Sequence, residues 1–277
     1  MQTHTNPDIS AIVDLDRYPL DQPGSAGYRT ALDAIQGDLD AFGCGVLKGF
    51  VRPGILAAMV EEADRVAPLA HRSFGRTNAY FTQHRDDLPE SHPLRRFYDR
   101  SNAFVPADNF GADSPLRAIY AWPPFADFIR TALRQQAFFP YADPLADVII
   151  NLTEEGAGFP WHFDTNNFTV TLAIQNREAG GEFEYVPALR TAEDEHYEAV
   201  QAALDDRSDR VRTLVLEPGD LQLFKGRYAL HRVRPVEGAA RRYVAIFSSV
   251  KKEGMVGRPH RPRQPSRPVL PLHHAHT

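Results

Sequence analysis

The chain has a single cysteine, Cys44, among its 277 residues, so an intrachain disulfide is excluded. No uncharged apolar run reaches the roughly 18 residues that a membrane span needs. The segment from Met1 to Asp8 lacks a basic stretch followed by an apolar run, so no signal peptide is expected there. These absences favour a soluble, cytoplasmic protein.

An excess of basic residues is also missing. The net charge is −5 and the sequence pI is about 6.1, which argues against a general nucleic-acid or membrane-surface binder. There is no GxGxxG after a strand-like run and no Walker loop, so a dinucleotide enzyme and a P-loop NTPase are not expected. A small molecule is therefore the expected partner.

With 43% hydrophobic residues, the chain can bury the core of one large domain or of a catalytic core with a cap. We expect a helical cap and support region at 1–140, a jelly-roll catalytic core at 141–250 and a basic, proline-rich tail at 251–277. Helical spacing of apolar residues predicts helices at 28–42, 53–66, 114–119 and 125–138. Between 67 and 111 the pattern weakens, which is typical of a long functional loop.

Beyond residue 140 the pattern changes to short β-strands. Strands are expected at 147–152, 168–175, 182–186, 211–216, 221–224, 230–233 and 242–250, with a helix inserted at 191–204. About eight short strands behind a helical half indicate an α+β fold. Its core is predicted to be a double-stranded β-helix (jelly roll), buttressed by the N-terminal helices.

A metal site is predicted from three side chains in this β half. His162 and Asp164 stand two positions apart beside a strand-like run, and residues i and i+2 of a strand share a face about 7 Å apart. His231, after the strand-like run 221–224, supplies a third ligand. Two histidines and one carboxylate form the facial triad that holds non-heme Fe(II). Its open positions can take a bidentate 2-oxo acid and O₂.

A co-substrate with a distal carboxylate also needs a fixed cation. Arg241 and Arg242 are candidates, and adjacent strand residues face opposite ways. We select Arg242, because residues 243–247 alternate consistently from it, and a guanidinium suits a carboxylate. Arg76, in the weakly patterned region, could hold a substrate carboxylate through a bidentate pair. The alternative for Arg76 is a plain surface arginine.

The motifs together resemble the Fe(II)/2-oxoglutarate-dependent oxygenase superfamily. More narrowly, they resemble its bacterial branch of radical hydroxylases and halogenases of free amino acids. The likeness covers roughly 147–256. It rests on Trp161-His162-Phe163-Asp164, Gly180-Gly181-Glu182-Phe183-Glu184-Tyr185, Pro218-Gly219-Asp220-Leu221-Gln222-Leu223-Phe224, Gly226-Arg227-Tyr228-Ala229-Leu230-His231-Arg232-Val233 and Arg242-Tyr243.

This resemblance implies that 2-oxoglutarate chelates Fe(II), is decarboxylated by O₂ to succinate, and drives oxidation of an unactivated C–H bond. Halogenating members of the branch have a small residue in place of the carboxylate ligand. Asp164 is present here, which favours hydroxylation over halogenation. Desaturation and cyclisation stay open. Lysine-acting members have a histidine where this chain has Phe159, so lysine specificity does not transfer.

Two other classes of protein remain possible from the sequence. One is a cupin-like metalloenzyme that does not use 2-oxoglutarate, in which replacing Arg242 would hardly affect turnover. The other is a non-catalytic jelly-roll binding module, in which His162 and His231 are ordinary buried histidines. Three tail histidines, His273, His274 and His276, resemble a metal-binding tract only by composition.

Overall fold

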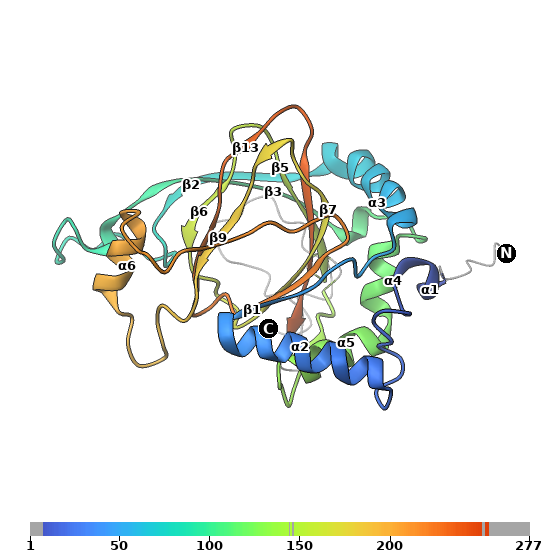
Figure 1. The fold of residues 1–277 in the computed structure, drawn as a ribbon. Coiled ribbons are helices and arrows are strands. Elements are labelled where there is room, and N and C mark those ends of the chain that lie inside the picture. Colours follow the sequence, from blue (N-terminus) through green and yellow to red (C-terminus); the bar gives the residue numbers. More distant parts are fainter. Residues whose placement is uncertain (1–7, 144, 146, 251–252, 255–277) are drawn as a thin grey trace.

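The computed structural model describes residues 8–143, 145, 147–250 and 253–254. Two antiparallel sheets face each other and form a flattened barrel, with most of the helices on one side of it (Figure 1). The predicted mixed fold, a double-stranded β-helix supported by helices, is confirmed. No helix within the described ranges is long and apolar enough to cross a membrane.

The main sheet has seven strands in the order β1-β11-β7-β14-β5-β3-β2. These are β1 (Cys44–Leu47), β11 (Leu221–Phe224), β7 (Thr169–Gln175), β14 (Arg242–Phe247), β5 (Val148–Thr153), β3 (Tyr98–Pro106) and β2 (His71–Thr77). Three of these strands, β1, β2 and β3, lie before residue 140. The sheet therefore combines strands from the predicted cap region at 1–140 and from the predicted core at 141–250.

The second sheet has four strands in the order β10-β9-β12-β6. These are β10 (Arg212–Leu214), β9 (Phe183–Val186), β12 (Leu230–Val233) and β6 (Phe159–His162). Two short pairs complete the β structure: β8 (Ala179–Gly180) with β13 (Val236–Glu237), and β4 (Phe139–Pro140) with β15 (Ser249–Val250).

The helices cover the outer face of the main sheet. They are α1 (Ile9–Ile12), α2 (Ala26–Phe42), α3 (Pro53–Val66), α4 (Pro115–Ala121) and α5 (Pro123–Ala132), with 3-10 turns at Ala67–Leu69, Pro93–Arg95 and Ala107–Asn109. The largest apolar cluster lies between these helices and the sheet, with Ile35 and Leu39 of α2 packed towards Ile150 and Leu172. Burying such side chains contributes roughly 1.5–3 kcal/mol each.

Local sequence accounts for the ends of α2. The hydroxyl of Ser25 accepts a hydrogen bond from the backbone N–H of Tyr28, which caps the first turn. Gly43 ends the helix with φ of +67°, a conformation that glycine adopts without a steric penalty. The predicted helix 28–42 is therefore confirmed, as is the helix beginning at Pro53.

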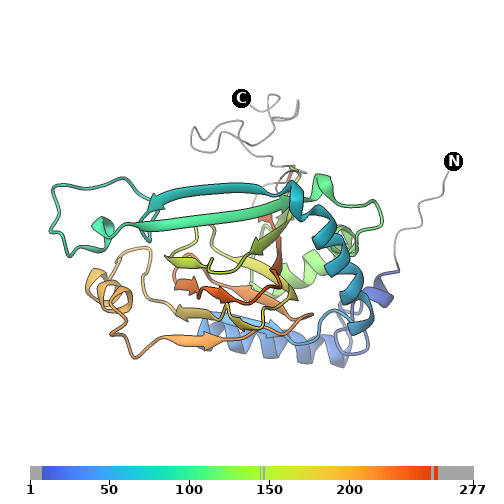
Figure 2. The same cartoon turned by 90° about the horizontal axis from the view of Figure 1, so that it is seen from above.

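The region 67–111, predicted to be a loop, contains β2 and β3. Figure 2 shows this pair running along one side of the barrel and past it towards α6 (Tyr197–Leu204). The residues of β2 lie at intermediate to high exposure on both faces, so the strand carries no alternating apolar pattern. It is held by backbone pairing to β3, from His71 opposite Phe104 to Thr77 opposite Tyr98.

Two predicted helices are shorter than expected. The helix predicted at 125–138 ends at Ala132. The one predicted at 191–204 begins only at Tyr197, because the hydroxyl of Thr191 accepts hydrogen bonds from the N–H groups of Glu193 and Asp194 and closes a separate turn. The predicted tail at 251–277 lies almost entirely outside the described residues.

Candidate metal and co-substrate site

The two histidines of the predicted triad meet across two neighbouring strands. His162, the last residue of β6, is the direct partner of His231 on β12, and their ring centroids are 4.1 Å apart. Nδ1 of His162 lies 2.8 Å from the carbonyl of Pro160, and Nδ1 of His231 lies 2.9 Å from the carbonyl of Ala229. These contacts place the ring proton on Nδ1 and leave each Nε2 free to bind a metal.

The Asp164 carboxylate lies beside the two histidine rings, although Asp164 itself lies beyond the end of β6. We expected His162 and Asp164 to share one strand face, but β6 ends at His162, and the N–H of Asp164 donates to the carbonyl of Gly226. Oδ1 of Asp164 lies 3.6 Å from Nε2 of His231 and 4.0 Å from Nε2 of His162. Its other oxygen, Oδ2, accepts a 2.6 Å hydrogen bond from the hydroxyl of Thr169. One carboxylate oxygen is therefore free for a metal.

The backbone beside Asp164 is shaped for a carboxylate at this position. A Cβ added to Gly226 would lie 2.0 Å from Oδ2 and 2.7 Å from Cγ of Asp164. Glycine at 226 thus leaves the space that the carboxylate occupies. Together with the hydroxyl of Thr169, this shows that the surrounding structure is built around Asp164.

The protonation states also suit metal binding. Burial lowers the pKa of His162 to about 3, so its imidazole is neutral at physiological pH. Burial alone would raise the pKa of the Asp164 carboxyl, but His231, His162 and the Thr169 hydroxyl hold that pKa below its usual range. One ligand atom from each of His162, Asp164 and His231 lies within 4.8 Å of the others. A neutral imidazole and an ionised carboxylate are the forms that bind a divalent iron, so His162 and Asp164 fit the predicted ion.

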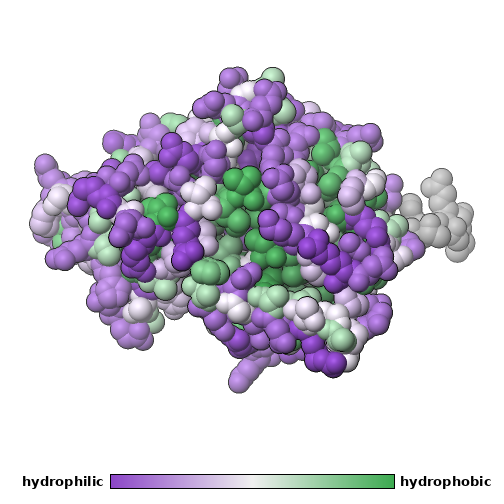
Figure 3. Space-filling model, in the orientation of Figure 1, coloured by the Kyte–Doolittle hydropathy of each residue, from purple (hydrophilic) through white to green (hydrophobic). Residues whose placement is uncertain are grey.

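The three side chains open into a cavity of about 190 Å³ between the two sheets. Its wall is made by the three predicted metal ligands, by several polar side chains of the main sheet, and by apolar ones. The lining residues are Arg100, Asn151, Phe159, His162, Asp164, Thr169, Thr171, Phe183, Leu216, Gln222, Phe224, His231, Val233, Arg242, Val244 and Ile246. Figure 3 shows the molecule in the orientation of Figure 1, in which the view runs along the barrel. Apolar residues gather near the middle of this face.

Arg242 lies in this cavity, as the alternation of β14 predicts, whereas Arg241 pairs with Glu154 at 3.3 Å outside it. No hydrogen bond or ion pair joins the guanidinium of Arg242 to another side chain or backbone group in the described part of the chain. Burial lowers the pKa of its guanidinium to about 10. Opposite Arg242 in the sheet, the buried hydroxyl of Thr153 has no partner either. A cation and a hydroxyl left unpaired side by side suit the distal carboxylate of a 2-oxo acid.

A second arginine of the cavity, Arg100 on β3, was not predicted. Its guanidinium carbon lies 5.1 Å from the ring centroid of Phe81 and 5.9 Å from that of Phe159, and its Nε is buried without a hydrogen bond. Phe81 is held at a positive φ of 57°, which is strained for a bulky residue. Nothing local in the sequence marks Arg100, because its place in the cavity follows from the path of β3, which pairs with β2 at Arg100 and with β5 at 104–106.

Arg76 does not line this cavity. It lies on β2 with 71% of its side chain exposed, and its nearest acidic group is Asp99 at 3.9 Å. Arg76 is therefore placed as a surface arginine, which was the alternative considered for it from the sequence. Within the cavity, the side-chain carbonyl oxygen of Asn151 is buried and unpaired, which adds one hydrogen-bond acceptor beside the arginines.

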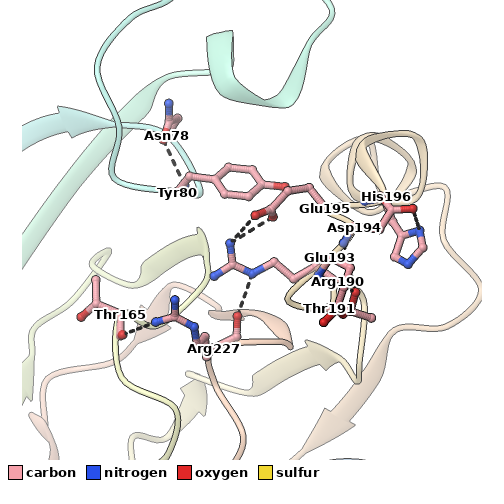
Figure 4. Close-up of polar contacts among 10 residues, drawn as sticks. All are labelled: Asn78, Tyr80, Thr165, Arg190, Thr191, Glu193, Asp194, Glu195, His196 and Arg227. Atoms are coloured by element: carbon pink, nitrogen blue, oxygen red, sulfur yellow. Dashed lines mark hydrogen bonds and ion pairs between the residues drawn. The ribbon is translucent and has the colours of Figure 1, made fainter.

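A polar network braces the chain segment that carries the ligands (Figure 4). Arg190 stacks 4.1 Å from the ring centroid of Phe163, the residue between His162 and Asp164. Its Nε donates to the carbonyl of Arg227 at 2.7 Å, and its Nη1 pairs with Glu195. Arg227 in turn donates to the carbonyl of Thr165 at 2.9 Å. The ligand segment is therefore fixed from the β9–α6 connection and from the β11–β12 turn.

Comparison with known proteins gives a family and a fold. A family model described as Halogenase D matches residues 29–255. No curated protein matches the chain.

Three solved structures have similar folds. A 2OG-Fe(II) oxygenase family oxidoreductase from Burkholderia pseudomallei has 14% identity and a TM-score of 0.51, over 80% of this chain and 92% of the other. The non-heme alpha ketoglutarate dependent epimerase SnoN from nogalamycin biosynthesis has 14% identity and a TM-score of 0.54, over 80% and 83%. AviO1 from Streptomyces viridochromogenes Tue57 has 16% identity and a TM-score of 0.51, over 82% and 96%. At these identities the likeness establishes the fold.

Proposed function

The chain belongs to the Halogenase D family. On this premise we propose that it is a non-heme iron enzyme that uses 2-oxoglutarate and O₂, and that it hydroxylates a C–H bond of an amino acid or amino-acid derivative. When bound, iron with 2-oxoglutarate and O₂ supplies the oxidant, and 2-oxoglutarate leaves as succinate and CO₂. The protein residues hold these groups in place and position the substrate.

The observation that carries the choice of hydroxylation is the setting of Asp164. A halide ion would need the coordination position that the Asp164 carboxylate fills. The hydrogen bond from Thr169 and the space beside Gly226 both serve that carboxylate. His162, His231 and Asp164 are thus proposed as the three iron ligands, which is the triad of an oxygenase rather than the two-histidine set of a halogenase.

The two arginines of the metal cavity are proposed to bind different carboxylates. We assign the distal carboxylate of 2-oxoglutarate to Arg242, beside the free hydroxyl of Thr153. Arg100, which joins the cavity wall from β3, then takes the carboxylate of the substrate, the role first considered for Arg76. The unpaired Asn151 oxygen offers an acceptor for an N–H group beside that carboxylate.

The test is incubation of anaerobically prepared enzyme with Fe(II), 2-oxoglutarate, chloride and a pool of amino acids and N-acylated amino acids, followed by addition of ¹⁸O₂. We expect substrate-dependent succinate and a product that has gained one labelled oxygen atom. The Asp164→Gly variant is expected to lose this product. A chlorinated product from the unaltered enzyme, or one that has lost two hydrogens without gaining oxygen, would contradict the proposal.

A further inference from the structure

A second, larger chamber adjoins the metal cavity. It has a volume of about 560 Å³ and shares two lining residues, Phe159 and Val233, with the cavity that holds the triad. Its other apolar walls include Trp161 and Leu204. Small-molecule sites are typically about 300–1,000 Å³, so the metal cavity of about 190 Å³ is below this range by itself, and the chamber is within it.

The charged side chains that line the chamber already have partners. These pairs are Arg96 with Asp205, Arg232 with Glu184 and with Asp206, Arg234 with Glu184, and Asp99 with Arg76. An entering charged group would have to break one of these pairs to gain its own partner. Among the described residues, the chamber therefore favours an uncharged ligand group.

Among the described residues that line the chamber, one buried polar side-chain atom is unpaired. The indole Nε1 of Trp161 is buried and has no hydrogen-bond partner. A buried donor without an acceptor costs free energy, which a ligand oxygen could recover. The wall thus combines apolar and aromatic side chains with charged ones that are already paired, and Trp161 adds a donor suited to a carbonyl or ether oxygen.

The metal cavity lacks a partner for a cationic substrate group as well. Asp164 is the one carboxylate among its described lining residues, and its oxygens face the two histidines and Thr169. The two arginines favour anions. A substrate with a second ammonium group, such as lysine, would therefore find no carboxylate in the metal cavity that is free of the triad. In the chamber it would meet only Asp99 and Asp206, which already pair with Arg76 and Arg232.

We propose that the substrate is an amphiphilic carboxylate, with its anionic head at Arg100 and a long uncharged body that extends past Phe159 and Val233 into the chamber. An amino acid whose nitrogen carries an acyl chain has this chemistry: one carboxylate, a carbonyl acceptor and no positive charge. This inference rests on the proposed function and narrows its substrate class.

The test compares ligands that share one head group. Affinities of leucine, lysine and N-acetyl-, N-hexanoyl- and N-decanoyl-leucine are measured by calorimetry on the enzyme with Fe(II) and 2-oxoglutarate, without O₂. Succinate formation with each compound is then measured in air. We expect affinity to rise with acyl length, by up to about fourfold per added methylene, because each buries apolar surface. Lysine is expected to bind worst.

Two tryptophan substitutions at exposed strand positions provide the matched variants. Ser101 on β3 lines the chamber, whereas Thr213 on β10 does not. Ser101→Trp is expected to remove the dependence of affinity on acyl length, and Thr213→Trp to retain it. Each variant's thermal unfolding shows whether it is folded.

The outcomes separate the two proposals. Affinity that is independent of acyl length, or tightest for lysine, overturns the inference and leaves the proposed function standing if succinate still forms. If affinity rises with acyl length but no compound causes succinate to form, the proposed class of ligand, an amphiphilic carboxylate, is supported. The proposed function as an oxygenase is then overturned.

Discussion

Arg100 and Arg242 are the two arginines that line the metal cavity, and the guanidinium group of neither makes a hydrogen bond or ion pair among the described residues. A charged hydrogen bond contributes about 1.5–3 kcal/mol, or roughly 10- to 150-fold in affinity. Arg242→Met is expected to weaken the apparent affinity for the co-substrate, 2-oxoglutarate, by that factor. Arg100→Met should weaken the apparent affinity for the substrate instead. Initial rates of succinate formation, with each compound varied in turn, measure both Michaelis constants.

The two variants control for each other, since both remove one guanidinium from the same cavity. If Arg242→Met leaves the Michaelis constant for the co-substrate unchanged, the enzyme does not hold 2-oxoglutarate there. The cupin-like alternative, which needs no 2-oxo acid, would then account better for the site.

Cys44 is a residue whose environment makes it unreactive. Burial raises the pKa of its thiol to about 11 from an ordinary 9.0, although the hydrogen bond from Gln222 opposes the shift. A raised pKa keeps the thiol protonated, so at pH 8 its thiolate fraction is about 100-fold below that of an ordinary thiol. We expect iodoacetamide to alkylate Cys44 at least about 100-fold more slowly in the folded protein than in guanidinium chloride. Rapid labelling of the folded protein at pH 8 would contradict this.

At the scale of elements, the turn between β11 and β12 connects the helical layer to the metal site. The Lys225 side chain donates to the carbonyl of Leu39 at 2.9 Å, and its backbone N–H donates to that of Gly43, at the end of α2. The next residue, Gly226, lies against Asp164. The C-terminal end of α2 therefore fixes the turn that positions the Asp164 carboxylate.

Gly226→Ala tests this arrangement. Its Cβ would displace the Asp164 carboxylate, and we expect affinity for Fe(II) or Mn(II) to fall by roughly 10- to 100-fold, the range found when the support of a metal ligand is disturbed. An anaerobic metal titration measures it. Gly75→Ala, on exposed β2 with no atom near the added Cβ, is the matched control and should bind metal normally. Equal affinities in both variants would show that Gly226 does not position Asp164.

At the scale of the whole molecule, the metal site joins parts of the chain that are distant in sequence. β6 and β12 carry the histidines, β3 and β14 carry the arginines, and the cavity lies between the two sheets. Ligands that bind only when these strands are assembled must stabilise the folded state. Stability should therefore depend on metal and 2-oxoglutarate together.

We expect Mn(II) and 2-oxoglutarate to raise the unfolding temperature. A ligand at 100 times its Kd contributes about 2.7 kcal/mol, or roughly 5–10 °C in a domain of this size. Calorimetry with and without a chelator measures the shift. A chain ending at Pro265, without the three tail histidines, should keep the shift, and His231→Ala should lose it. A shift that disappears with the tail instead would assign the metal to those histidines.

The sequence by itself determined the elements that local patterns encode. Apolar spacing of 3.6 identified α2 and α3, and apolar runs identified β5, β7, β11 and β14, because these periods follow from the geometry of each element. The spacing of His162 and Asp164, followed by His231, pointed to the triad, since few other arrangements use those residues beside strands. Alternation along β14 selected Arg242 over Arg241.

Only the tertiary structure decided what surrounds the triad. The strand β2 and the place of Arg100 on β3 depend on backbone pairing over long sequence distances, which requires no local pattern in the side chains. Asp164 meets the histidines because the turn at Gly226 holds it after β6 has ended, a contact that sequence spacing does not encode. The chamber beyond Phe159 is likewise formed by side chains from separate strands and from α6. Local geometry fixed the elements, and long-range packing fixed the space between them.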